Sequence, residues 1–273
     1  MNNKILKYLN QKRDMVWNDL LDIHASAPDK TRVASSLSMV EILSTLYYGG
    51  FIKTSKKKPN LKKDDVVIFS KGHGSLAVYS IFADYKFFEK KYLYDVCGNG
   101  KLLGSIPEPN IPGIISINGS LGHGLGVLSG ISFANKNTKK KYYCFLGDGE
   151  MNEGSVWEAI MMIPQLKLNR MVAIVDANKK SMLGETKDII DLKNLKRKFQ
   201  EFGWEAYSVN GHSIKSIYKL FSSLNKKEPV KPIAVISNTF KGGTIKKLRD
   251  IDICHVISLN DDEVKRYKVK QNS

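Results

Sequence analysis

Tyr142-Tyr143-Cys144-Phe145-Leu146-Gly147-Asp148-Gly149 is the stretch that decides the fold. Its first five residues form a short apolar run, which is typical of a strand buried on both faces of a parallel sheet. The glycines of the Gly-Asp-Gly turn let the backbone approach a ligand closely. Because α/β sheets bind ligands at the carboxyl ends of their strands, the sequence places Asp148 at a candidate site.

A second segment of the same kind lies downstream. Residues 171–175 form another short apolar run that predicts a buried strand, and Asn178 follows it, thirty positions after Asp148. A carboxylate and an amide oxygen at adjacent strand ends suit Mg²⁺, which takes a few protein oxygens and completes its octahedron with ligand phosphates. A Gly-Asp-Gly turn alone is common turn chemistry, so the metal interpretation depends on both strand ends together.

The rest of the chain is helical at first and then alternates between strands and helices. Strands are predicted at 66–69, 142–146, 171–175, 204–209 and 232–237, and helices at 10–23, 38–48, 120–135, 154–163, 191–202 and 213–224. This alternation indicates the α/β class: a doubly wound, mostly parallel sheet with helices on both faces. We expect a single domain over residues 1–273, with a short helical amino-terminal region.

One helix start has its own signature. Ser38-Met39-Val40-Glu41 has the spacing of a capping box, in which Ser38 accepts from the amide of Glu41 and the Glu41 carboxylate reaches back. A helix is therefore predicted to begin at Ser38.

Two segments that contain glycine and histidine add to the candidate site. Ser70-Lys71-Gly72-His73-Gly74 follows a predicted strand and opens a helix, so its amides can face an anion and His73 supplies a further donor. Gly119-Ser120-Leu121-Gly122-His123-Gly124-Leu125-Gly126 holds glycines that weaken a helix unless close approach requires them. Spacing alone leaves open a purely structural histidine and glycines that serve helix packing.

In combination, these segments resemble the diphosphate-binding domain of transketolases, from about Asp14 to Val264. The resemblance implies the thiamine-diphosphate-binding fold, with thiamine diphosphate and Mg²⁺ as cofactors. The metal ligands would be Asp148, Asn178 and the backbone carbonyl of Lys180. The implied cofactor-binding residues are His73, Gly119, Ser120, Leu121, Gly149, Asn178 and His255.

The resemblance also implies three catalytic residues, His73, Glu153 and His255. Thr239-Phe240-Lys241-Gly242-Gly243, then His255, matches a Lys-Gly turn and a histidine of transketolases at a similar distance. The match puts His255 beside the diphosphate and the reacting centre, where a histidine can move protons near neutral pH. Glu153 would face the partner subunit near the cofactor. The alternatives are a loop histidine without a role and an ordinary acid near the positive end of a helix.

Two positions depart from the family pattern. Arg32 stands where transketolases usually have the histidine of a Gly-His pair, and Ser105 aligns with a second histidine. Both histidines belong to the family's sugar-substrate channel, so the donor or acceptor sugar is expected to differ from ordinary pentose phosphates. Arg32 could instead bind a phosphate or carboxylate, although a surface salt bridge remains an alternative.

The formal charge of +16 is compatible with nucleic acid, an anionic membrane or a phosphorylated substrate. However, the basic runs are dispersed along the sequence, at 56–58, 139–141, 196–198 and 265–266, and no aromatic platform accompanies them. A solvated basic surface is favoured, so we expect neither a nucleic-acid partner nor a membrane partner.

The remaining composition predicts a cytoplasmic protein. The first ten residues are polar and basic without the apolar centre of a signal peptide, and no apolar run approaches the roughly 20 residues that span a bilayer. Cys97, Cys144 and Cys254 lack metal-like spacing, so they are expected to be free thiols.

The function that the resemblance implies is the amino-terminal subunit of a split transketolase. Such a subunit takes part in transferring a two-carbon ketol unit between a ketose and an aldose, and phosphorylated or modified sugars are the expected class here. In transketolases a pyrimidine-binding domain supplies the activating glutamate and a carboxyl-terminal domain follows; we expect neither in residues 1–273. Activity would therefore need a separate carboxyl-terminal subunit, as an α₂β₂ assembly. The alternatives are a related synthase, similar to 1-deoxyxylulose-5-phosphate synthase or using another ketoacid, and a non-catalytic scaffold subunit.

Overall fold

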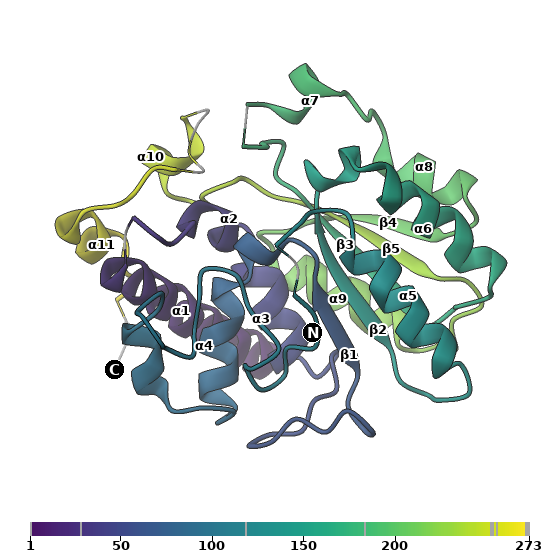
Figure 1. Cartoon of the computed structure of the whole chain (residues 1–273), viewed down its shortest axis with the longest axis horizontal. Helices are drawn as coiled ribbons and strands as arrows, with labels where there is room; N and C mark the ends of the chain where they lie inside the picture. Colours follow the sequence, from purple (N-terminus) through teal and green to yellow (C-terminus); the bar gives the residue numbers. More distant parts are fainter. Residues whose placement is uncertain are drawn as a thin grey trace.

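Parallel strands form a central sheet, with helices packed on both of its faces (Figure 1). The computed structural model describes residues 2–27, 29–117, 119–182, 184–251, 254 and 256–270. Within them the sheet has five strands in the order β1-β2-β3-β5-β4, and every neighbouring pair is parallel. The strands are β1 (Val66–Phe69), β2 (Tyr142–Gly147), β3 (Met171–Ala177), β4 (Glu205–Asn210) and β5 (Ile233–Asn238).

The helices divide between the two faces of the sheet. The longer ones are α1 (Asn3–Ser26), α3 (Val40–Tyr48), α4 (Leu76–Asp84), α5 (Gly124–Ala134), α6 (Gly154–Gln165), α8 (Leu195–Glu201), α9 (Ile214–Leu224) and α11 (Asp261–Tyr267). Short helices are α2 (Val33–Leu37), α7 (Thr186–Ile189) and α10 (Lys246–Arg249), with 3₁₀ turns η1 (Gly72–Gly74), η2 (Lys90–Tyr94) and η3 (Glu150–Asn152). Apolar residues of α1, α3, α4 and α9 share one core, and those of α5, α6 and α8 share the other.

The alternation of side chains along β2 explains why there are two cores. Tyr143 and Phe145 belong to the first core, whereas Tyr142, Cys144 and Leu146 belong to the second. All residues of this strand are buried because successive side chains point to opposite faces and helices cover both. The doubly wound α/β fold expected from the sequence is confirmed.

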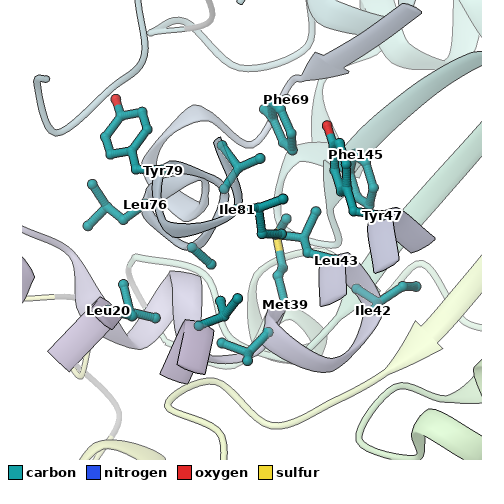
Figure 2. Close-up of a cluster of buried hydrophobic side chains, with 14 of the residues drawn as sticks. Leu20, Met39, Ile42, Leu43, Tyr47, Phe69, Leu76, Tyr79, Ile81 and Phe145 are labelled. Carbon is teal, nitrogen blue, oxygen red and sulfur yellow. The ribbon is translucent and has the colours of Figure 1, made fainter. Parts of the chain in front are cut away.

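Figure 2 shows the part of the first core that lies between α3, α4 and the sheet. There, Ile81 of α4 and Leu43 of α3 lie near the stacked rings of Phe69 and Phe145, whose centroids are 5.3 Å apart. This packing anchors β1 and β2 against the amino-terminal helices, and so fixes the strand ends from which the site is built.

Several predicted boundaries differ from the structure. The first helix runs over Asn3–Ser26 rather than 10–23. The helix predicted at 120–135 begins only at Gly124, because Gly122 has a φ of +88° that no helix accommodates. The helix predicted at 191–202 is shorter, Leu195–Glu201, and its N-cap is Asn194, whose side chain accepts from the amide of Arg197.

The capping box predicted at Ser38 is wrong. Helix α3 begins at Val40 without any side-chain cap. The Ser38 hydroxyl donates to buried Asp176 at 2.6 Å, and Glu41 lies 3.2 Å from the ring of His212. Both side chains instead contact residues that are distant along the chain, which the local spacing does not reveal.

Two smaller expectations are also resolved. The three cysteines form no disulfide among the described residues, as predicted. Among the described residues, no helix combines the length and apolarity that crossing a bilayer requires.

Candidate functional site

The carboxyl ends of β2 and β3 border a cavity of about 600 Å³. The two strands are paired so that Gly147 lies beside Asp176. Asp148 and Asn178, which follow β2 and β3, are therefore neighbours, and the backbone N–H of Lys179 donates to the Asp148 carboxylate at 2.5 Å. The fold thus brings these two side chains to one edge of the sheet, where the sequence predicts them.

Most of the residues singled out from the sequence line this cavity. They are His73, Gly119, Leu121, Asp148, Gly149, Glu153, Asn178 and Lys180, together with Arg32 and Ser105. Ser120 lies between two lining residues but is not itself among them. His255 lies outside the described residues, so its place beside the reacting centre stays a prediction.

Hydrogen bonds orient the side chains of two candidate metal ligands. Asp148 accepts from the backbone N–H of Gly149 at 2.9 Å as well as from Lys179. The Asn178 amide nitrogen donates to Asp176 at 2.9 Å, and its oxygen accepts from the N–H of Lys180 at 3.1 Å. These contacts fix which end of the Asn178 amide is the oxygen.

Asp176 is the buried centre of this arrangement. It forms an ion pair with Lys71, and both side chains are almost fully buried. The hydroxyls of Ser38 and Thr239 and the amide of Asn178 also donate to it. Burial opposes its ionisation, but the charge of Lys71 and these hydrogen bonds hold the pKa of Asp176 below its ordinary value. One ionised carboxylate thus ties β3 to β1, α2 and the end of β5.

Two buried lysines, Lys71 and Lys241, line the cavity. The sequence analysis assigned neither of them to the site. Lys71 donates to the carbonyl of Ser35 at 2.9 Å, and Lys241 donates to that of Ser181 at 2.8 Å. Lys241 also reaches the carbonyl of Lys180 at 3.4 Å. Their positions in the sequence could have indicated both lysines, because each follows closely after a strand in a turn that contains glycine. Because Lys71 is paired with Asp176, Lys241 is the one of these two cations that no carboxylate neutralises among the described residues.

Burial shifts the pKa of charged groups on both sides of the cavity. Burial, and then the charge of Asp176, raises the pKa of Asp148 to about 7. Burial lowers the pKa of Lys241 to about 8. A divalent cation beside Asp148 would favour its ionised form, and an anion beside Lys241 would favour the protonated amine. The cavity is therefore suited to a cation and an anion bound together.

The donor set fits Mg²⁺ and a diphosphate. One carboxylate, one amide oxygen and one backbone carbonyl are hard oxygen ligands, which leave the remaining positions of an octahedron to phosphate oxygens and water. The described residues contain no cluster of three or more His, Cys, Asp or Glu that would suit a different metal. A single carboxylate balances only one of the two positive charges of Mg²⁺. The phosphate groups of the ligand would balance the other.

Glu150 links the Asp148 turn directly to residues 122–124, which we call the glycine segment. Its carboxylate is buried and accepts from the N–H of Gly122 at 2.9 Å and the N–H of Gly147 at 3.1 Å. The Ser70 hydroxyl donates to the same carboxylate and accepts from the N–H of Gly124 at 3.1 Å. Residues 122–124 are thereby held against the ends of β1 and β2.

Close packing explains why glycines occupy this segment. A Cβ on Gly122 would lie 2.7 Å from the Cβ of Glu153, and its φ of +88° disfavours any other residue. A Cβ on Gly124 would lie 2.5 Å from that of Ser70. The carbonyl of Gly122 also accepts from the Ser155 hydroxyl at 3.0 Å. Gly122 and Gly124 thus serve close approach, whereas a Cβ on Gly126 would meet nothing within 4 Å. Both backbone groups of Gly122 have side-chain partners.

Replacing Glu150 by Gln is expected to weaken both stability and cofactor binding. The carboxylate offers two acceptor oxygens, whereas a glutamine side chain offers one oxygen and one NH₂ donor. The NH₂ group would face a backbone N–H, so one buried donor would lose its acceptor. The expected loss is about 1–3 kcal/mol of unfolding free energy. Urea unfolding measures this loss, and titration calorimetry measures the accompanying fall in affinity for the Mg²⁺-thiamine diphosphate that the resemblance implies.

Glu158→Gln is the matched control, because Glu158 is exposed on α6 and the substitution removes the same charge. If the two variants unfold at the same urea concentration and bind alike, Glu150 does not hold the glycine segment.

The mouth of the cavity carries two further cations, Lys30 and Arg32. Lys30 donates to the carbonyl of Cys97 at 3.2 Å, and Arg32 makes a long contact of 3.4 Å with the carbonyl of Asp29. Neither forms an ion pair with an acid in the described part of the chain. Ser105 lines the same mouth. The two positions that depart from the family pattern therefore line the same cavity.

A buried histidine fixes the loop that carries Arg32. His24 Nε2 accepts from the N–H of Leu259 at 2.9 Å, so the proton is on Nδ1, which donates to the Thr31 hydroxyl at 2.7 Å. Thr31 in turn donates to the carbonyl of Ala27 at 2.9 Å. Burial lowers the pKa of His24 to about 4, so the ring stays neutral near pH 7. Sequence reasoning missed this residue because its partner Leu259 is distant along the chain.

A second cavity of about 540 Å³ adjoins Asp148 on the side of residues 185–196. Its charges are balanced locally, since Lys187 pairs with Glu185 at 2.8 Å and Lys193 with Asp191 at 2.7 Å. Among the described residues, no buried cation lines it, in contrast to the first cavity. The first cavity is therefore the candidate site.

Comparisons with known proteins agree on one family. Residues 29–272 match the family model described as "Transketolase, thiamine diphosphate binding domain". The chain is 34% identical over 250 residues to a subunit of the apulose-4-phosphate transketolase of Actinobacillus succinogenes, covering 90% of each chain. It is 32% identical over 213 residues to the 6-deoxy-6-sulfo-D-fructose transketolase subunit SqwG of a Clostridium species, covering 77% of each.

Solved structures show the same fold. A Pichia stipitis transketolase variant, solved with xylulose 5-phosphate, superposes with a TM-score of 0.82 at 21% identity. The match covers 94% of this chain but only 40% of that one, so the chain corresponds to less than half of that transketolase.

Proposed function

The chain belongs to the transketolase family, in its thiamine-diphosphate-binding domain, and on that premise we propose that it is the diphosphate-binding subunit of a two-subunit transketolase. The reaction is the transfer of a two-carbon ketol unit from a ketose to an aldose. The observation that carries the proposal is the cavity that combines the Asp148, Asn178 and Lys180 oxygens with the buried ammonium group of Lys241. The naming of both relatives as subunits supports a separate partner.

Each part of the cavity has a proposed role in holding the cofactor. Asp148, Asn178 and the carbonyl of Lys180 hold Mg²⁺. His73 and Gly149 lie against the diphosphate, and Lys241 neutralises part of its charge. The segment Gly119-Ser120-Leu121 supports the cofactor from the opposite side. When bound, thiamine diphosphate supplies the reactive carbon and the electron sink for moving the two-carbon unit.

The proton-handling residues are proposed on the family resemblance. His255 would donate to or accept from substrate hydroxyls, and Glu153 would meet the partner subunit beside the cofactor. Glu153 is exposed at the rim of the cavity, which supports a role at an interface. We further propose an α₂β₂ assembly with a subunit that carries the pyrimidine-binding and carboxyl-terminal domains, and a cytoplasmic location.

The sugar is proposed to differ from an ordinary pentose phosphate. Arg32 and Ser105, which replace two histidines of the family's substrate channel, line the cavity, as does Lys30. The relatives carry names that specify apulose 4-phosphate and 6-deoxy-6-sulfo-D-fructose, which supports a modified sugar. Arg32 offers a planar, permanently charged group that can bind an anionic substituent bidentately.

In the assembled enzyme, xylulose 5-phosphate with ribose 5-phosphate is expected to be a poor substrate pair. Two lost donors leave hydroxyls unpaired at about 0.5–1.5 kcal/mol each, which lowers kcat/KM by roughly tenfold to a hundredfold. The experiment compares kcat/KM for this pair with that for modified phosphorylated or sulfonated ketoses, in the wild type and in Arg32→His/Ser105→His.

The double variant should recover the lost efficiency with the pentose phosphates and lose efficiency with the preferred sugar. Efficient pentose transfer by the wild type, near 10⁴ M⁻¹s⁻¹ or about the ordinary enzymatic range, would show that the replacements are neutral. Absence of ketol transfer with every sugar would contradict the proposed function itself.

A further inference from the structure

Most of the net charge of the chain lies in four short segments, 53–65, 136–141, 167–170 and 225–231. They hold 15 of the 43 Lys and Arg residues and 3 of the 27 Asp and Glu residues, which is +12 of the total +16. The remaining residues, which include the cofactor cavity, account for the other +4. A charge distribution this uneven requires an explanation that a basic amino-acid composition alone does not give.

The fold brings these four segments together. They precede β1, β2, β3 and β5, and the parallel register places the first residues of these strands along one edge of the sheet. We call this edge the basic face. It lies at the amino ends of the strands, opposite the carboxyl ends that border the cavity, and Figure 1 shows the loops before β1 and β2 on the same side of the molecule.

Hydrogen bonds join the four segments into one continuous surface. Lys140 donates to the carbonyl of Leu61 at 2.8 Å, which joins the first two segments. Arg170 donates to the carbonyl of Lys139 at 3.2 Å and pairs with Glu228 at 2.6 Å, which joins the remaining two. The basic face is therefore a single fixed surface rather than four independent loops.

The three acids of the basic face leave the lysines largely uncompensated. Asp64 is buried and accepts from the Ser55 hydroxyl and a backbone N–H at 2.6 Å each. Asp65 accepts from the backbone N–H groups of Lys53 and Lys141. Only Glu228 forms an ion pair among the described residues of this face, with Arg170. Twelve of the 15 cations have exposed side chains.

The side chains on the basic face fit an anionic bilayer better than a nucleic acid. Fourteen of the 15 cations are Lys, and the four segments contain no Phe, Trp or Tyr. Nucleic-acid surfaces use Arg forks and aromatic rings that stack on bases. Leu61 and Val230, by contrast, are aliphatic side chains exposed to 59% and 76% among the lysines. Lysines around projecting apolar residues are typical of proteins that bind anionic lipid surfaces.

We propose that the basic face docks the chain peripherally on a bilayer that contains anionic phospholipids. The lysines are attracted to the lipid phosphates, and Leu61 and Val230 enter the headgroup region. The interaction needs no membrane-spanning helix, and the described residues contain none. Because the cavity opens at the opposite ends of the strands, a docked chain leaves its cofactor cavity accessible to substrate and partner. The sequence-based expectation of no membrane partner depended on lysine runs dispersed along the chain, and the fold brings two of those four runs, 56–58 and 139–141, onto one face.

The test is co-sedimentation of the full chain with vesicles of phosphatidylcholine alone, and with about 30 mol% phosphatidylglycerol, at roughly 0.1 M salt. Binding is expected only to the anionic vesicles. Lys58→Glu/Lys62→Glu/Lys139→Glu should weaken it by about a hundredfold or more, since one lysine near such a surface contributes about fivefold. Leu61→Ser/Val230→Ser should remove the part of binding that persists at high salt.

Lys7→Glu/Lys215→Glu/Lys219→Glu is the matched control, because it makes the same change of charge at exposed positions of α1 and α9. Equal weakening by both triple variants would show that overall charge, not the basic face, attracts the vesicles, and would overturn the proposal. Absence of binding to anionic vesicles would overturn it too. Tighter binding to a single-stranded RNA than to the vesicles, at the same salt, would assign the face to nucleic acid instead.

Discussion

The purified chain alone is expected to show no ketol transfer with any sugar, even with Mg²⁺ and thiamine diphosphate in excess. The family resemblance assigns cofactor activation to a glutamate of the pyrimidine-binding domain. Within the described residues, the buried carboxylates beside the cavity are engaged, Asp148 with backbone amides and Glu150 with the glycine segment. Glu153 lies at the exposed rim. No other acid lines the described part of the cavity and could take over that role.

The measurement is a titration of the chain with its partner subunit in a coupled ketol-transfer assay. The rate is expected to rise from background in proportion to added partner and to level off at equal amounts of the two chains. The partner alone should be equally inactive. Robust turnover by the isolated chain would contradict the two-subunit proposal, whereas a plateau at another ratio would contradict only the α₂β₂ stoichiometry.

Asp148→Asn is expected to reduce the affinity of the assembled enzyme for Mg²⁺-thiamine diphosphate by at least about a hundredfold. Loss of groups that merely orient a metal ligand already costs about 10–100-fold, and Asp148 is proposed as the only carboxylate ligand. Titration calorimetry at fixed Mg²⁺ measures the effect. Asp191→Asn, at an exposed acid paired with Lys193, is the control of equal charge change.

The same variant is expected to have the opposite effect on the chain without metal and cofactor. Because the pKa of Asp148 is raised to about 7 from an ordinary 3.8, the folded state holds this proton more tightly than the unfolded state. The stability due to this group is therefore complete below about pH 4 and is lost as the pH rises to about 7, by at most about 4 kcal/mol.

An asparagine side chain at position 148 cannot ionise, so the Asp148→Asn variant should melt at a higher temperature than the wild type at about pH 8, with a smaller difference at about pH 5. Added Mg²⁺ and thiamine diphosphate should stabilise the wild type and not the variant. A variant that gains as much as the wild type from the cofactor would rule out Asp148 as the metal ligand.

The strands were the most predictable part of the fold. Each buried strand is a short apolar run closed by glycine or polar residues, and the strands predicted at 66–69 and 142–146 agree with the structure to within a residue. Helix boundaries were less predictable, because they depend on contacts that spacing does not show. Ser38 and Glu41 have capping-box spacing, but their partners are Asp176 and His212, which lie 138 and 171 positions away.

The candidate site divides in the same way. Asp148 and Asn178 were predictable because each directly follows a buried strand, and parallel strands bring their carboxyl ends to one edge. The Lys71–Asp176 pair and the contact of Glu150 with Ser70 were not, since their atoms meet across 105 and 80 positions of sequence. His255 remains a prediction from the resemblance.

The sequence by itself determined the class of fold, the strand ends that form the site and the family, because burial and turn chemistry leave local patterns. Only the tertiary structure decided how charged residues are partnered. It pairs Lys71 with Asp176 in the interior, brings Arg32 and Ser105 to the same cavity, and gathers four separate basic loops on one face. The physical reason is that electrostatic interactions depend on distances in space, which the order of residues along the chain does not contain.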